Sequence, residues 1–238
     1  MKMNKRMSGG FTLVELLVVI VIIAALAGLT APMVIRQRKK ADQTEATNNA
    51  RQIGLALFEF ETAYNSFPDQ NTIKDVTDNT GTQLTLGTSS SNDFFRQLIA
   101  AEISSSEAMF YAKAAYSKKP DNIFNTAEKA LANGEVGFGY IMNNTTAFST
   151  AGNPARPIVC APLYSADGSS ISADGQFDLD FYDLKAVVLR IDNSVTSLPL
   201  LRTTRLAQLG GGKNLLATGQ DTVWGDGVTP KIIAPLPK

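Results

Sequence analysis

An uncharged run over residues 16–35 constrains this chain more than any other part of its sequence. These are about 20 residues, which as a helix rising ~1.5 Å per residue cover ~30 Å, the thickness of a bilayer's hydrocarbon core. A short basic segment precedes the run, and four basic residues within 36–40 follow it. The pattern predicts a membrane-spanning helix.

One acidic residue, Glu15, stands at the N-terminal end of this run. An unpaired carboxylate inside a membrane costs about 2–3 kcal/mol or more, so we expect Glu15 to have a positively charged partner. The candidate partner is the amine that a cut after Gly10 would create on Phe11.

The segment Gly10-Phe11-Thr12-Leu13-Val14-Glu15, between the basic leader and the apolar run, resembles the type IV pilin family, including the pseudopilins of type II secretion. The resemblance implies that a prepilin peptidase cleaves between Gly10 and Phe11 and that the Phe11 amine is then methylated. It also implies that Glu15 acts in filament assembly and that Pro32 kinks the helix. A secretory signal peptide is the alternative interpretation, but the apolar run is too long for one, and no Ala-x-Ala-type site follows it.

The resemblance continues to Ala63-Tyr64-Asn65-Ser66-Phe67-Pro68, which is similar to the end of the long helix in major pseudopilins. It implies a single-pass protein of the bacterial inner membrane, with the leader in the cytoplasm and the remainder outside. The count of Lys and Arg near the two ends of the run does not favour that orientation, so it rests on the resemblance.

The fold class that we expect is α+β, with a long N-terminal helix packed on a small antiparallel β-sheet, as in pilins. We divide the chain into a leader (1–10), a transmembrane and filament-core helix (11–35), an amphipathic continuation of that helix (36–66) and a globular α+β head (67–238). Local melting or a kink is expected near Gly28 and Pro32, since proline removes a helical hydrogen bond.

The amphipathic continuation has apolar residues at helical spacing, which predicts one face buried against the sheet. These residues are Ala46, Ala50, Ile53, Leu57, Phe60 and Tyr64. Gly54 favours close packing against the head, and the helix is expected to end between Tyr64 and Phe67 because Pro68 follows.

Turn-forming residues predict a loop over 71–91, with a short strand at 83–86. A helix is expected over 93–101, with Ser91 or Asn92 as its N-cap, and a second short helix over 106–116. Strands are expected at 136–142, 156–161, 176–181 and 184–191, the last of them central, forming a meander of three or four antiparallel strands.

An Asp-rich stretch is the candidate metal site of the head, since carboxylate oxygens suit calcium. The proposed ligands are Asp174, Asp178 and Asp180, and Asp221 with Asp226 forms a second acidic group. Turn formation explains both groups as well, and the spacing matches no EF-hand. No cofactor is expected to be required.

Composition argues against catalysis and nucleic-acid binding. The formal net charge is zero, so there is no overall attraction to nucleic acid. The chain has no histidine, which excludes Ser-His-Asp and Cys-His catalytic arrangements. We therefore expect that the protein is not an enzyme. The single cysteine, Cys160, is expected to be buried as a small apolar residue.

The expected function is that of a structural subunit in a homo-oligomeric filament, either a type IV pilus or a type II secretion pseudopilus. The absence of an intramolecular disulfide favours a pseudopilin. The length of the head favours either a pilus subunit or a third alternative, a minor pilin acting as an adhesin or ligand-binding module. The partners implied are the prepilin peptidase and the inner-membrane assembly platform.

Overall fold

The computed structural model of the protein describes residues 12–126 and 130–238. Its helices are α1 (Leu13–Tyr64), α2 (Thr72–Thr80) and α3 (Ser91–Ala100), followed by the 3-10 turn η1 (Ala108–Phe110). The chain divides into two compact units, Met1–Lys39 and Lys40–Lys238, and α1 contributes residues to both.

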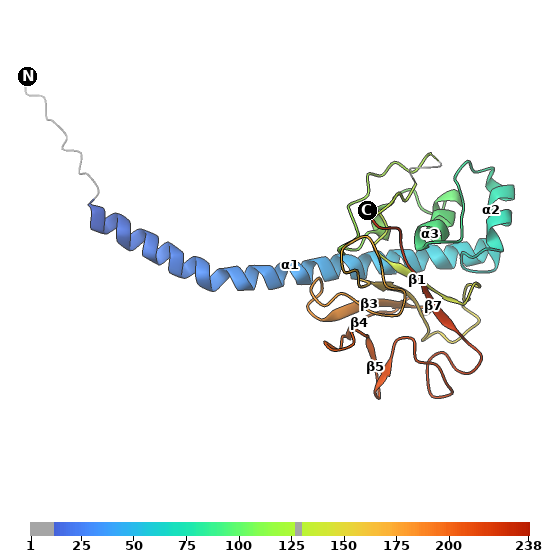
Figure 1. The fold of residues 1–238 in the computed structure, drawn as a ribbon. Helices are drawn as coiled ribbons and strands as arrows, with labels where there is room; N and C mark the ends of the chain where they lie inside the picture. The colour runs from blue at the N-terminus through green and yellow to red at the C-terminus, as the bar shows by residue number, and fades with distance from the viewer. Residues whose placement is uncertain (1–11, 127–129) are drawn as a thin grey trace, which may run out of the picture. The chain divides into compact units, whose positions relative to one another are not determined.

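The second unit contains an antiparallel sheet with the strand order β4-β3-β2-β1-β7. Its strands are β1 (Gly139–Asn143), β2 (Pro157–Ala161), β3 (Lys185–Arg190), β4 (Val195–Pro199) and β7 (Pro230–Ile233), and a separate hairpin is formed by β5 (Gln208–Gly210) and β6 (Lys213–Asn214). Strands β1 to β4 form a meander, and β7 returns to pair with β1 (Figure 1). The α+β architecture is therefore confirmed.

The predicted sheet was incomplete. Strands β4 and β7, the two edges, were not predicted, so the sheet has five strands and not three or four. Strand β3 has partners on both sides, as expected from its apolar sequence on both faces. The strand expected at 176–181 is absent from the described structure: Gln176 and Phe177 make isolated bridges, and the Asp178 side chain then accepts the Asp180 N–H in a turn.

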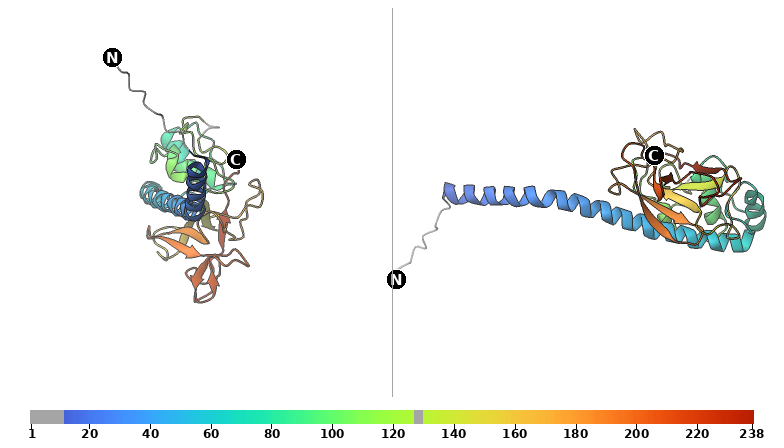
Figure 2. Two further views of the ribbon diagram at one scale, coloured as in Figure 1. Left: turned by 90° about the vertical axis from the view of Figure 1, so that its left-hand side faces the viewer. Right: turned by 90° about the horizontal axis from the view of Figure 1, so that it is seen from below.

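Within the second unit, α1 lies along the sheet (Figure 2) and buries the predicted apolar face. Ala46, Ala50, Ile53, Leu57 and Phe60 are all fully buried. They belong to one core cluster with residues of β1, β2 and β3, so the second half of α1 is part of the hydrophobic core.

The end of α1 is confirmed. The last helical residue is Tyr64, and Asn65 adopts a left-handed conformation with φ of 60°. The Asn65 N–H donates to the Glu61 carbonyl at 2.7 Å. Asparagine tolerates this conformation better than most residues, so it stops the helix before Pro68.

Helix α2 lies where a loop was predicted, and no strand forms at 83–86. The Asp69 carboxylate accepts the backbone N–H groups of Asn71 and Thr72, which satisfies donors at the start of α2. Thr72 and Val76 are buried, one turn apart. The polar composition of this segment predicts a loop, although the buried residues Thr72 and Val76 have helical spacing.

Helix α3 was predicted, but its N-cap was assigned wrongly. The cap is Ser90, whose hydroxyl accepts the Asp93 N–H while the Asp93 carboxylate accepts the Ser90 N–H, a reciprocal capping box. The buried positions Phe94, Phe95 and Leu98 are confirmed. Of the short helix expected over 106–116, the structure has only the turn η1.

Candidate functional site

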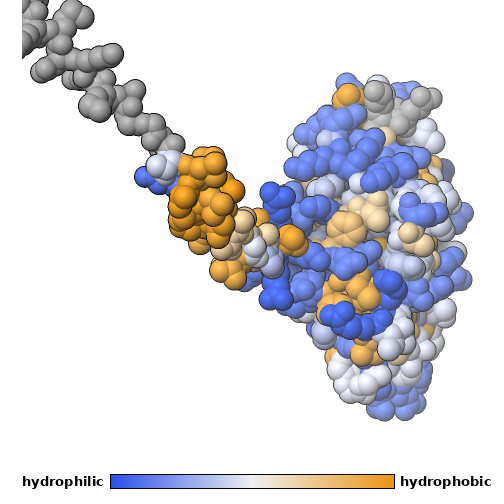
Figure 3. Space-filling model, turned by 60° about the vertical axis from the view of Figure 1, so that its left-hand side comes forward, coloured by the Kyte–Doolittle hydropathy of each residue, from blue (hydrophilic) through white to orange (hydrophobic). Residues whose placement is uncertain are grey.

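The first half of α1 has an apolar surface that the described residues of the protein do not cover. Every large apolar side chain between Leu13 and Ile35 is at least 46% exposed. The helix is long and apolar enough to cross a membrane, and none of its most apolar window is buried. Figure 3 shows apolar side chains over the face of this part of the helix that is turned toward the viewer. So much unburied apolar area requires lipid or other protein subunits around it.

The N-terminus of α1 is closed by a capping box between Thr12 and Glu15. The Thr12 N–H and hydroxyl donate to Glu15 Oε2 at 2.9 and 2.7 Å, and the Glu15 N–H donates to the Thr12 hydroxyl at 3.3 Å. This contact uses one carboxylate oxygen of Glu15. The sequence analysis did not identify Thr12, although Thr-x-x-Glu before an apolar run is a recognisable capping signal.

The predicted cleavage and methylation positions, Gly10 and Phe11, lie outside the described residues. Pro32 lies inside α1, and the helix continues through it without the local melting that was considered near Gly28. The Thr30 hydroxyl donates to the Leu26 carbonyl at 3.0 Å in this part of the helix. The kink at Pro32 stays a prediction.

The predicted calcium ligands do not form a cluster of carboxylates in the described structure. Asp174 and Asp180 are exposed, and Asp178 is half-buried. The Asp178 carboxylate accepts the Asp180 N–H at 2.8 Å, and the Asp174 N–H donates to the Ser172 hydroxyl at 3.3 Å. These are turn contacts, which agrees with the alternative explanation for the stretch.

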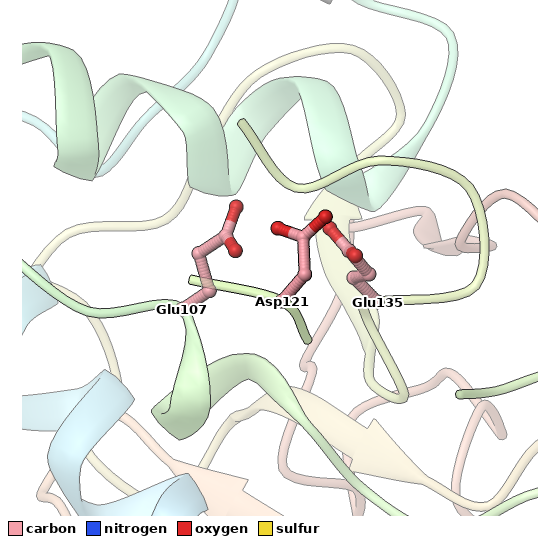
Figure 4. A group of neighbouring side chains, drawn as sticks. All are labelled: Glu107, Asp121 and Glu135. Carbon is pink, nitrogen blue, oxygen red and sulfur yellow. The ribbon is translucent and has the colours of Figure 1, made fainter. Parts of the chain in front are cut away.

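A different acidic group does form, in the segment between α3 and β1. Oxygens of Glu107, Asp121 and Glu135 all lie within 4.8 Å of one another. Figure 4 shows the three carboxyl groups close together, with Asp121 between the two glutamates. Both glutamates are fully buried, whereas Asp121 is exposed.

This arrangement raises the pKa of Glu107. Burial is the largest cause, and the charges of Glu135 and Asp121 raise the pKa further. The hydrogen bond from the Leu131 N–H lowers the pKa but does not outweigh these causes. No local sequence signal could have identified the group, because its members come from three separate stretches of irregular chain and meet only in the folded head.

The prediction for Cys160 is confirmed. Its side chain is fully buried on β2, and burial raises the pKa of the thiol. The described structure uses it as a small apolar residue of the core.

Comparison with known proteins supports a pilin or pseudopilin family. Residues 5–31 match the family described as "Prokaryotic N-terminal methylation motif", and residues 36–134 match "Protein of unknown function (DUF1559)". A 66-residue stretch is 39% identical to "Type II secretion system core protein G" from Aeromonas hydrophila. That match covers 28% of this chain and 46% of the relative, so the chain spans less than half of the relative's length. No solved structure matches.

Proposed function

We propose, on the premise that this chain is a pilin- or pseudopilin-type subunit, that it is a structural component of a filament assembled from the bacterial inner membrane. A prepilin peptidase cleaves between Gly10 and Phe11, and the Phe11 amine is methylated. The first half of α1 holds the subunit in the membrane, with the head outside the cytoplasm, until an assembly platform adds it to the filament.

The observation that carries this proposal is the uncovered apolar surface of α1 between Leu13 and Ile35, with Glu15 at its N-terminal end. Lipid covers such a surface before assembly, and the same helices of neighbouring subunits cover it afterwards. In the apolar interior of a filament, a carboxylate needs an opposite charge. The Phe11 ammonium of an adjacent subunit supplies that charge and sets the register of addition.

A type II secretion pseudopilus is the filament that we favour. The similarity to a type II secretion core protein supports it, as does the lack of an intramolecular disulfide in a chain with one cysteine. A type IV pilus subunit and a minor pilin acting as an adhesin or ligand-binding module are the alternatives, supported by the length of the head.

The experiment that tests the proposal is co-expression of the chain with a prepilin peptidase, followed by mass spectrometry of the membrane-extracted protein. We expect loss of residues 1–10 and a methyl group on Phe11. Gly10→Leu is the matched control, because a side chain before the cut obstructs close approach of the backbone. An intact N-terminus, or a cut after the apolar run, would overturn the proposal.

A further inference from the structure

The acidic group of Glu107, Asp121 and Glu135 is held in place by backbone contacts. The Leu131 N–H donates to Glu107 Oε1 at 2.6 Å, and the Ala132 N–H donates to Glu135 Oε2 at 2.8 Å. The Glu107 N–H donates to the side-chain oxygen of Asn122 at 3.0 Å, which keeps the chain next to Asp121 beside Glu107. The three carboxyl groups therefore meet because three chain segments are tied together around them.

One oxygen of each buried glutamate lacks a hydrogen-bond donor among the described residues. These atoms are Glu107 Oε2 and Glu135 Oε1. Lys118 Nζ lies 3.5 Å from Glu135 Oε1 and forms an ion pair with it but no hydrogen bond, and the Lys118 side chain is half exposed. Among residues 12–126 and 130–238, no Lys or Arg forms an ion pair with Glu107 Oε2. A buried carboxylate oxygen with no partner is costly, so a missing ligand is indicated at this point.

The net negative charge of this acidic group favours the binding of a divalent cation. Within the part of the chain that the structure describes, three carboxylates in their charged form and the Lys118 ammonium leave two negative charges. The group contains oxygen donors and neither sulfur nor imidazole, which selects a hard cation such as Ca²⁺ or Mg²⁺. Two oxygens on opposite sides of a calcium ion at ~2.4 Å lie ~4.8 Å apart, and the oxygens of this group all lie within 4.8 Å of one another, so a single ion can contact all three residues.

We propose that Glu107, Asp121 and Glu135 form a calcium site that joins the three segments of chain between α3 and β1. The buried glutamates supply Oε2 of Glu107 and Oε1 of Glu135, and Asp121 supplies a carboxylate oxygen from the exposed side. Water reaches the ion past Asp121 and completes its about 6–8 oxygen ligands. Magnesium is the less suitable ion, since it demands near-ideal octahedral geometry. The site is distinct from the Asp174 stretch.

The site has a structural consequence for the head. In its described residues the chain between α3 and β1 has η1 as its regular structure, so backbone ladders contribute little to its order. An ion that binds residues distant in sequence stabilises the folded state, because the unfolded chain does not assemble the ligands. Calcium therefore fixes the part of the head that lies against α3.

The test is calcium titration of the chelator-treated full chain in detergent, by isothermal calorimetry and by thermal unfolding. We expect one calcium ion per chain and a rise in Tm. Titration extends to about 10 mM, above the ~0.1–1 mM dissociation constants of extracellular calcium modules. Asp121→Asn, an exposed and fold-preserving change, is expected to weaken binding by about tenfold or more, since ligand charge tunes the affinity. Glu107→Gln is expected to abolish it.

Asp174→Asn is the matched control, and its calcium affinity is expected to equal that of the unchanged chain. Three results would overturn the proposal: no binding at the highest calcium concentration, undiminished binding by Asp121→Asn, or loss of binding by Asp174→Asn. Saturation by magnesium without saturation by calcium would overturn the choice of ion. Each readout is a binding or unfolding measurement, so none depends on filament assembly.

Discussion

Gly54 on α1 and Asn193 in the turn between β3 and β4 approach so closely that a Cβ atom on Gly54 would lie 2.1 Å from Asn193 Oδ1. The same Cβ would lie 3.1 Å from Leu189 Cδ1 on β3. Asn193 has a φ of 61°, as its place in the tight turn requires. A glycine inside a helix costs about 1 kcal/mol relative to alanine, and this contact explains why one is present.

Gly54→Ala is expected to destabilise the head by about 1–3 kcal/mol, because overpacking outweighs the gain in helix propensity. Urea unfolding of the full chain in detergent measures the effect. The control is the same change in an Asn193→Gly background, which keeps the left-handed backbone but removes the obstructing side chain. There, Gly54→Ala is expected to be neutral or stabilising, and an equal cost in both backgrounds would contradict the contact.

Two substitutions at Glu15 separate its capping contact from its proposed charge pairing. Glu15→Gln keeps an oxygen that accepts from the Thr12 N–H but removes the negative charge, whereas Glu15→Ala removes both. We expect both variants to be cleaved and folded, and both to give few filaments, measured by shearing and immunoblotting. If Glu15→Gln assembles normally while Glu15→Ala does not, capping and not charge is the role of this residue.

The capping box of α3 predicts a dependence of stability on pH. Burial alone would raise the pKa of Asp93, but hydrogen bonds from Ser89 and Ser90 and the Arg96 charge outweigh it, so the pKa is lowered. For an acid with a lowered folded pKa, the stabilisation is present above the unfolded pKa of about 3.9 and is lost as pH falls through the folded value.

Asp93→Asn is therefore expected to destabilise the protein at pH 7 by about 1–3 kcal/mol, through lost charged hydrogen bonds. The difference from the unchanged chain is expected to shrink as pH falls below about 4. Urea unfolding at several pH values measures it. A difference that is constant between pH 7 and pH 3 would show that the Asp93 charge has no part in it.

Truncation tests whether the second half of α1 belongs to the core. A chain starting at Arg36 lacks the apolar run but keeps the buried residues from Ala46 to Phe60, so we expect it to be soluble and to unfold cooperatively. A chain starting at Phe67 loses those residues, each large one worth about 1.5–3 kcal/mol of burial, and is expected to aggregate. Equal solubility and equal resistance to urea would contradict the packing of α1 on the sheet.

Features whose physical cause lies within a few residues could be predicted from the sequence. The composition of the uncharged run is enough to predict that it lies in an apolar environment. The spacing of the apolar residues from Ala46 to Phe60 is enough to predict one buried helix face. The end of α1 follows from Asn65 and Pro68 in the same way. The capping box of Thr12 and Glu15 is equally local, because its two residues are three positions apart at the start of the apolar run.

The tertiary structure decided the features that depend on distant parts of the chain. Residues 230–233 form strand β7 because they pair with the free edge of β1. The short sequence of β7 does not by itself predict a strand. The candidate site of Glu107, Asp121 and Glu135 exists because separate segments fold around one point. The spacing of apolar residues and the capping of helix ends involve residues within one or two helical turns. The pairing of strands and the clustering of carboxyl groups depend instead on which distant segments the fold brings together. The sequence by itself therefore determined the long apolar helix and its buried continuation, and only the folded head decided the sheet edges and the acidic site.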